Sequence, residues 1–414
     1  MEVREKSAKY ETKVELKQTA VGLIPQDWEV KRLSEISPSQ SVGLVINPSS
    51  HFEEHGNVPM LVGSNLSANR IAWESARRIS ESSNAALTAS RLRAGDLVTV
   101  RVGEPGITAV VPPELDGCNC ASVMIVRRHK DFDSHWLAYL MNSPTGLGQV
   151  QSVQYGTAQK QFNISDAVAF LFPAPPSAEQ GAIAKALRNV DALIESLEQL
   201  IAKKRHIKQG AMQELMSGER RLPGFSGEWE RKTFGDVARP RKERIDPRTE
   251  GPQGFCIELE HIDPGSGRLL GSGSTGETSS LKSVFYPDDV LFGKLRAYLR
   301  KYWLADCRGV CSTEVWVLVA SSWVDAKFLF HVVTGNEFIE AASNAYGTHM
   351  PRSDWNVVTN YELAVPPLPE QTAIATILSD MDAELTALEA KLTKTRQLKQ
   401  GMMRELLTGR IRLV

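Results

Sequence analysis

Hydrophobic residues recur at alternating steps of four and three in two long stretches of the chain. This spacing is that of the a/d seam of a coiled coil. Each stretch follows a Pro-Pro pair and ends at Gly218 or Gly409, which are common helix boundaries. We predict long helices over 177–218 and 367–414. The seam positions are Ile183, Leu187, Val190, Ile194, Leu197 and Ile201 in the first, and Ile374, Leu378, Met381, Leu385, Leu388 and Leu392 in the second.

The two stretches are copies of one segment. Gln180 and Gln371 begin similar sequences, and the offset of 191 residues (371 − 180) holds without a gap up to Leu222 and Leu413. A long repeat of this kind indicates a duplicated protein. One amphipathic helix would more often be buried in the core of its own domain. The duplication favours instead two helices that pack on each other as an antiparallel coiled coil with an internal pseudo-twofold repeat.

The regions before the helices also repeat. Trp28 and Trp229 each stand just before a basic pair, the turn 93–98 aligns with 286–291, and Gly156-Thr157 matches Gly347-Thr348. Short apolar runs broken by Gly, Pro, Asn and Asp predict mostly strands and loops, with occasional helices. The expected fold class is α+β, with two mixed α/β globular domains over 21–176 and 219–366. Residues 1–20 are charged and aperiodic, which predicts a flexible tail.

Composition narrows the class of protein. The 414 residues are 42% hydrophobic and 23% charged with a formal net charge of −1, as in an ordinary globular protein. This balance argues against a uniformly basic nucleic-acid binder but allows local basic faces. No apolar run is long enough to cross a membrane. The five cysteines are an odd number without a C-x-x-C motif, which fits a reduced cytoplasmic protein.

Catalytic motifs are weak. The stretch 271–276 satisfies G-x-G-x-x-G, but it lies in a Gly/Ser loop with no strong strand before it and no apolar helix after it. There is no phosphate-binding G-x-x-x-x-G-K-[ST] sequence, and the histidines are scattered without metal-ligand spacing. We therefore expect no catalytic residues and no metal site on this chain.

The order of these motifs, present twice, resembles the specificity subunit of type I restriction-modification systems. The strongest marks are Pro366-Pro367-Leu368-Pro369-Glu370-Gln371 and the stretch 290–299. The resemblance implies two target recognition domains, each reading one half of a bipartite, asymmetric site on double-stranded DNA. It implies helices that set the gap and dock two methyltransferase subunits, which restriction (motor-nuclease) subunits join. It also implies no cofactor on this chain, with S-adenosylmethionine, ATP and Mg held by the partners.

Basic and polar side chains gather at two repeated places, the end of an apolar strand and the Gly-Thr loop. Arginine side chains can hydrogen-bond to guanine edges, and glutamine side chains to adenine edges. A solvent-exposed strand face or the residue preferences of an ordinary turn would also explain these residues. A coiled-coil adaptor that binds only proteins is the alternative function, and a steep salt dependence of DNA binding separates the two. The candidate DNA-binding residues are Arg101, Thr157, Gln159, Lys160 and Gln161 in the first domain, and Lys294, Arg296, Tyr298, Arg300, Thr348, His349 and Arg352 in the second.

Overall fold

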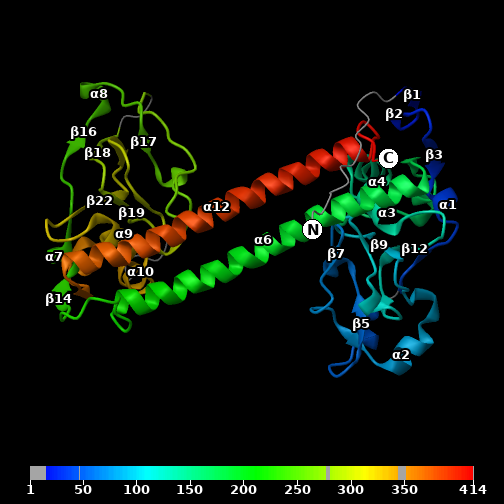
Figure 1. Ribbon diagram of the computed structural model, residues 1–414, viewed down its shortest axis with the longest axis horizontal. Helices are drawn as coiled ribbons and strands as arrows, with labels where there is room; N and C mark the ends of the chain where they lie inside the picture. The colour runs from blue at the N-terminus through cyan, green and yellow to red at the C-terminus, as the bar shows by residue number, and fades with distance from the viewer. Residues whose placement is uncertain (1–14, 46, 277–279, 344–350, 414) are drawn as a thin grey trace, which may run out of the picture. The chain divides into compact units, whose positions relative to one another are not determined.

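The computed structural model describes residues 15–45, 47–276, 280–343 and 351–413. The chain divides into two units (Figure 1). Unit 1 comprises Met1–Leu197 and Leu392–Val414, and unit 2 comprises Glu198–Lys391. Each unit holds one globular domain and a part of each long helix, α6 (Ser177–Ser217) and α12 (Leu368–Leu406).

Both predicted helices are present, with a small correction. α6 ends one residue before the predicted position 218, whereas α12 ends at Leu406 instead of continuing to 414. The cause is Gly409, whose φ of +70° lies in the left-handed region that ends helices.

A four-stranded antiparallel sheet forms the centre of unit 1. Its order is β10 (Thr108–Val110), β9 (Leu97–Val100), β12 (Val123–Val126) and β4 (Gln40–Val42). Alternate residues along a strand face opposite sides of a sheet. Leu97 and Met124 accordingly join one hydrophobic cluster, and Val98 and Ile125 join another. Because both faces are covered, the strands read as continuous apolar runs.

Helices cover one face of this sheet, and a second small sheet covers the other. The helices are α3 (Ser134–Met141), α4 (Pro144–Val153) and the start of α6, whose residues share the cluster of Leu97. The second sheet has the order β11 (Asn119–Cys120), β5 (Val58–Leu61) and β8 (Arg78–Ile79). Figure 1 shows β5 and α2 (Glu81–Ala86) at the end of the domain away from α6. Further short elements include α1 (Leu33–Ile36), β6 (Leu66–Ser67), β7 (Arg70–Ile71) and α5 (Ile164–Ala167).

The first residues of unit 1 correct one expectation. β1 (Leu16–Thr19) forms an antiparallel hairpin with β2 (Gly22–Pro25), so the predicted flexible tail does not extend to residue 20. Gly22 has φ +101° and completes the turn, which gives this polar strand a partner that periodicity alone did not reveal. β3 (Glu29–Arg32) then pairs with β13 (Leu171–Ala174), the strand that leads into α6.

Unit 2 repeats this plan, which confirms the α+β class. Its main sheet has the order β15 (Ala238–Pro240), β22 (Val315–Ala320), β19 (Val290–Gly293) and β20 (Tyr302–Leu304). Its second sheet has the order β16 (Arg244–Ile245), β18 (Lys282–Phe285), β21 (Gly309–Ser312) and β17 (Cys256–Ile257). β14 (Glu230–Thr233) pairs with β23 (Glu362–Val365), the strand before α12. The helices are α7 (Phe234–Val237), α8 (Pro247–Glu250), α9 (Ala326–Thr334), α10 (Asn336–Ser343) and α11 (Trp355–Val358).

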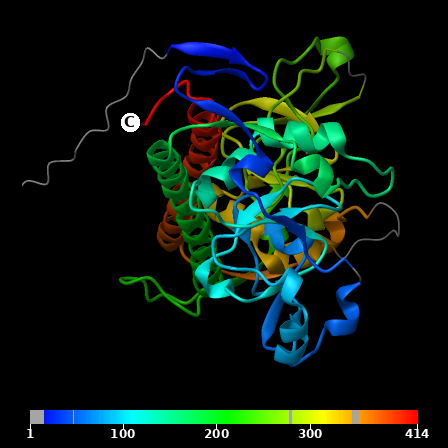
Figure 2. The ribbon, with the colours of Figure 1, turned by 90° about the vertical axis from the view of Figure 1, so that its right-hand side faces the viewer.

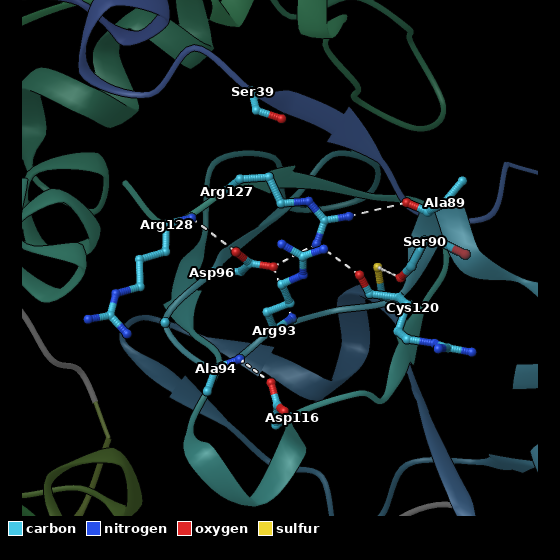
Figure 3. A network of polar contacts seen from close by, with 12 residues as sticks. Ser39, Ala89, Ser90, Arg93, Ala94, Asp96, Asp116, Cys120, Arg127 and Arg128 are labelled. Atoms are coloured by element: carbon cyan, nitrogen blue, oxygen red, sulfur yellow. Dashed lines mark hydrogen bonds and ion pairs between the residues drawn. The ribbon is translucent and has the colours of Figure 1, made fainter. Parts of the chain in front are cut away.

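A buried carboxylate holds the turn before the central strand in each unit. Asp96 accepts hydrogen bonds from the backbone N–H groups of Arg93 (2.9 Å) and Arg128 (3.0 Å) and from the Arg127 guanidinium (2.6 Å) (Figure 3). Asp289 in unit 2 accepts a bond from the Tyr286 N–H (2.8 Å) and pairs with Arg241 through both of its oxygens. The predicted alignment of the two turns is therefore confirmed, and these aspartates are structural.

Replacing Asp96 by alanine is expected to lower the free energy of unfolding of unit 1 by about 2–3 kcal/mol, because three donors lose one buried acceptor. Urea denaturation measures this change. The matched control is Asp116→Ala, since exposed Asp116 accepts a single bond from the Ala94 N–H (2.8 Å) (Figure 3). The control should lose no more than about 1 kcal/mol. Equal losses in both variants would contradict the assigned role of Asp96.

Candidate nucleic-acid interface and helix anchors

In unit 1 the two groups of candidate residues meet at the end of β9. Tyr155 and Gln161 exchange backbone hydrogen bonds of 2.8 and 2.9 Å, which closes the loop 156–160. Gln161 also bridges to Val102, and the Gly103 N–H donates to the Lys160 carbonyl (3.0 Å). The polar loop therefore lies beside the segment 101–103 that follows the strand.

The side chains at this edge are available for binding. Thr157, Gln159 and Lys160 are exposed, and their side chains bond to no residue that the structure describes. Arg101 is half-buried, and its Nε has no hydrogen-bond partner among the described atoms. Gly156 has a structural reason of its own, because φ is +97° and an added Cβ would lie 2.2 Å from the Gln159 carbonyl oxygen. The loop thus presents polar groups on a tightly turned backbone.

Unit 2 builds the same edge at the end of β19. Leu295 bridges to Arg352, the Arg296 N–H donates to the Pro351 carbonyl (2.9 Å), and the Ser353 N–H donates to the Lys294 carbonyl (2.8 Å). Gln161 and Arg352 stand 191 residues apart and bridge to corresponding segments. Two further candidates, Thr348 and His349, lie outside the described residues.

The structure divides the cations of this edge into two groups. Arg300 donates to the Asn336 side-chain oxygen (2.6 Å), and Arg352 pairs with Glu314 (2.9 Å). Lys294 and Arg296, in contrast, have no side-chain partner among the residues described. Tyr298 is 53% exposed beside them. Among the described candidate residues of this edge, Lys294, Arg296 and Tyr298 are therefore the ones whose side chains are free to bind.

The first positions of each predicted helix seam lie in a hydrophobic cluster that contains both domain-core residues and residues of the other long helix. Ile183 and Leu187 join the cluster of unit 1 that also holds Leu406 of α12. Ile374 and Leu378 join the cluster of unit 2 that also holds Leu215 of α6. Each helix begins directly after a strand of its domain, so its first turns face that domain's core. Farther along, Leu197, Ile201 and Leu385 are buried, and Val190, Ile194, Met381, Leu388 and Leu392 are half-buried.

Within each unit, α6 and α12 run side by side in opposite directions (Figures 1 and 2). In unit 2, Lys204 pairs with Glu384 (2.7 Å) and Lys208 with Asp382. In unit 1, Lys399 pairs with Asp191 (2.6 Å). Lys208–Asp382 and Lys399–Asp191 are the same ion pair in the two copies, because both members are shifted by 191 residues. Ion pairs therefore link the two helices where the seams become polar.

A buried glutamate anchors the start of α12 in unit 2. Glu370 has 1% of its side chain exposed and accepts two bonds from Arg221 (both 2.7 Å), which follows the end of α6. The Trp229 indole N–H also donates to it (3.1 Å). Next to it, Gln371 binds the Pro366 carbonyl (2.9 Å) and accepts from the Asp325 N–H (2.9 Å). The Glu-Gln pair therefore ties the helix start to the domain and to the other helix.

Unit 1 contains the same anchor. Glu179 accepts from the Trp28 indole N–H (3.0 Å) and twice from Arg412 (2.7 and 2.8 Å), which also pairs with Asp27. Gln180 binds the Pro175 carbonyl (2.9 Å). The role of these residues was not predicted from the sequence. The signal was available, because Glu179/Glu370 and Arg221/Arg412 are identical at the offset of 191.

In the part of the chain that the structure describes, no helix is long and apolar enough to cross a membrane. The same residues contain no group of three or more His, Cys, Asp or Glu side chains that could hold a metal ion.

Comparison with known proteins places the chain in a family. The family model for the type I restriction modification DNA specificity domain matches residues 25–203 and 271–400, and the chain belongs to this family. The chain is 25% identical over 275 residues to the type I restriction enzyme EcoDI specificity subunit of Escherichia coli. That match covers 57% of this chain and 61% of the relative, so the chain matches about three fifths of the relative's length.

Two solved structures share the fold. The type I restriction-modification system S subunit from M. genitalium has a TM-score of 0.59 at 13% identity, covering 92% of this chain and 96% of that one. A chain from a study of complex assembly and conformational transition of the type I R-M system has a TM-score of 0.52 at 17% identity, covering 94% and 99%. At these identities the likeness shows the fold alone.

Proposed function

We propose that this chain is a non-catalytic DNA sequence-specificity subunit of a type I restriction-modification complex. The observation that supports it most is the edge built twice, in which a polar loop lies beside the segment after the central strand. Each edge exposes a lysine without a described partner, Lys160 in unit 1 and Lys294 in unit 2, although Lys294 is only half exposed. Such groups hold DNA phosphates, while neighbouring arginine and glutamine side chains read base edges.

The two edges differ in the side chains they present, so the two half-sites should differ. Unit 1 presents Thr157, Gln159 and Lys160, whereas unit 2 presents Lys294, Arg296 and Tyr298. The DNA target is then bipartite and asymmetric, and the helices set the unread gap. The helices also dock two methyltransferase subunits, which restriction subunits join. S-adenosylmethionine, ATP and Mg belong to those partners.

DNA binding tests this proposal against the adaptor alternative, which the family membership does not favour. The chain is combined with its methyltransferase partners and titrated with duplex DNA at increasing salt. A DNA reader releases counterions from the phosphates it contacts, so log K should fall steeply and linearly with log salt. A protein adaptor would bind DNA weakly and without sequence preference, and that result would overturn the proposal.

Lengthening both helices by seven residues, at 197/198 and 391/392, is expected to widen the gap of the target. Seven residues add about 10 Å of helix, which corresponds to about three base pairs at 3.4 Å each. A heptad keeps the seam in register. Methylome sequencing reads the result, which should be unchanged half-sites at a larger spacing. A heptad inserted into α6 alone is the control, because it mispairs the antiparallel helices and should abolish methylation. Altered half-sites would contradict the spacer role.

A further inference from the structure

A short turn after β19 carries backbone strain on both sides. Arg296 (φ 55°, ψ 59°) and Arg300 (φ 52°, ψ 49°) are both left-handed and flank a single 3₁₀ turn, Ala297–Leu299. This conformation places the Cβ of an L-residue too close to the backbone and is routine only for glycine. Two arginines in this conformation, four residues apart, call for an explanation.

Unit 1 shows that glycine builds the corresponding turn. Gly103 (φ +96°) and Gly106 (φ +102°) are its two left-handed residues. The match is fixed by backbone bonds, since the Gly103 N–H donates to the Lys160 carbonyl as the Arg296 N–H does to the Pro351 carbonyl. The turn of unit 1 is one residue shorter, but in both units it has a residue with positive φ at each end, and unit 1 builds it without arginine.

The two arginines differ in what their side chains do. The Arg300 guanidinium donates to Asn336 (2.6 Å), so a contact inside the unit offsets its strain. Arg296 is exposed, and its side chain has no partner among the described residues. Strain that no contact with a described residue offsets points to a role outside the unit.

The turn is also tied to its surroundings by burial and hydrogen bonds, and it carries large apolar groups. Ala297 is buried (3% exposed), the Arg300 carbonyl accepts from the Gly265 N–H (2.8 Å), and Lys301 binds the Leu259 carbonyl (2.6 Å). Tyr298 and Leu299 are 53% and 39% exposed on this fixed frame. A cation beside apolar groups on a turn tied down in this way suits the groove of a duplex, where base edges and methyl groups lie together.

We propose that Arg296 is a specificity-determining residue of unit 2 and that it reads a guanine in the major groove of its half-site. This inference rests on the proposed function. A phosphate contact needs only a positive charge, which any flexible surface lysine supplies without strain. The planar fork of arginine matches guanine O6 and N7 with two parallel hydrogen bonds, and this match depends on a defined position of the side chain, which the left-handed backbone favours.

The test uses the complete complex with its methyltransferase subunits, the DNA site first being selected from a randomised duplex library. Each guanine of a half-site is then replaced in turn by 7-deazaguanine, which lacks N7. For the wild-type chain, one such replacement should weaken binding about tenfold. Arg296→Gly should bind the unmodified site about tenfold more weakly and show no further loss with 7-deazaguanine. Its melting temperature should not fall, because glycine suits the left-handed backbone.

Arg300→Gly is the matched control, because it changes the same residue type at the other left-handed position. It should lose the bond to Asn336 but keep the sensitivity to 7-deazaguanine. If Arg296→Gly keeps that sensitivity, or if no guanine N7 matters in either half-site, the assignment of Arg296 is overturned while DNA reading by the chain stands. If the wild-type complex selects no sequence at all, the proposed function itself fails.

Discussion

Replacing Glu370 by alanine is expected to lower the free energy of unfolding of unit 2 by about 3 kcal/mol. The carboxylate is buried and accepts two bonds from Arg221 and one from Trp229. Removing one member of a buried ion pair leaves the other charge without its partner and typically costs about 3–5 kcal/mol. The lower end applies because 28% of the Arg221 side chain is exposed, so water can hydrate it in the variant.

Urea denaturation of the full chain, with the probe placed in unit 2, measures this change. The matched control is Glu362→Ala, since Glu362 pairs with Arg231 while both side chains are exposed (66% and 82%). Exposed pairs contribute about 0–1 kcal/mol, so the control should unfold almost as the wild type does. A Glu370→Ala variant as stable as the control would show that the anchor does not hold the helix start.

The long helices could be predicted because their signal is local. A repeated seam and helix-ending glycines lie within one segment, and both helices appear where the pattern placed them. The seam does not show which surface each of its residues contacts. Ile183 and Leu187 satisfy a heptad equally well whether they face a helix or a domain core, and the core they join includes residues from α3.

The candidate interface was predictable only in outline. The repeated Gly-Thr loop and the basic strand end indicated the right edge, since the backbone pairings at Gln161 and Arg352 follow the repeat. The sequence did not show whether each basic side chain is bound to another residue. Arg300 and Arg296 look alike in the chain, yet Arg300 binds Asn336, 36 residues away, and Arg296 has no side-chain partner among the described residues. Such differences depend on tertiary contacts that no local pattern contains.

The buried Glu–Arg pairs at the helix starts also leave a pattern in the sequence, and the heptad spacing of apolar residues does not include it. A coiled-coil reading treats Glu179 and Glu370 as polar residues near a helix start, where carboxylates are common. Their partners Arg412 and Arg221 follow the end of the other helix. Each pair therefore joins two segments of its unit that lie far apart in the sequence. A charged residue repeated exactly in both copies of a duplicated segment is better explained by a shared contact than by solvation.

Replacing Arg412 by alanine is expected to destabilise unit 1 by about 3–5 kcal/mol. The arginine is 7% exposed, pairs with Glu179 and Asp27, and lies over the Trp28 ring at 5.7 Å. Its removal leaves Glu179, whose side chain is 3% exposed, as a buried carboxylate without its cation. The control is Arg410→Ala, because Arg410 is 60% exposed and reaches Glu405 only at 3.9 Å. Its effect should be within about 0.5 kcal/mol.

The same substitution should change how the stability of unit 1 depends on pH. Hydrogen bonding to the Arg412 guanidinium holds the pKa of Asp27 below its usual value of 3.8. Because the folded-state pKa is lower than the unfolded-state value, the contribution of Asp27 is complete above about pH 4 and disappears as pH falls through the folded-state pKa. Urea denaturation between pH 6 and pH 2.5 should therefore show a smaller acid loss in Arg412→Ala than in the wild type. Parallel pH profiles for the two proteins would mean that Asp27 is not held by this arginine in solution.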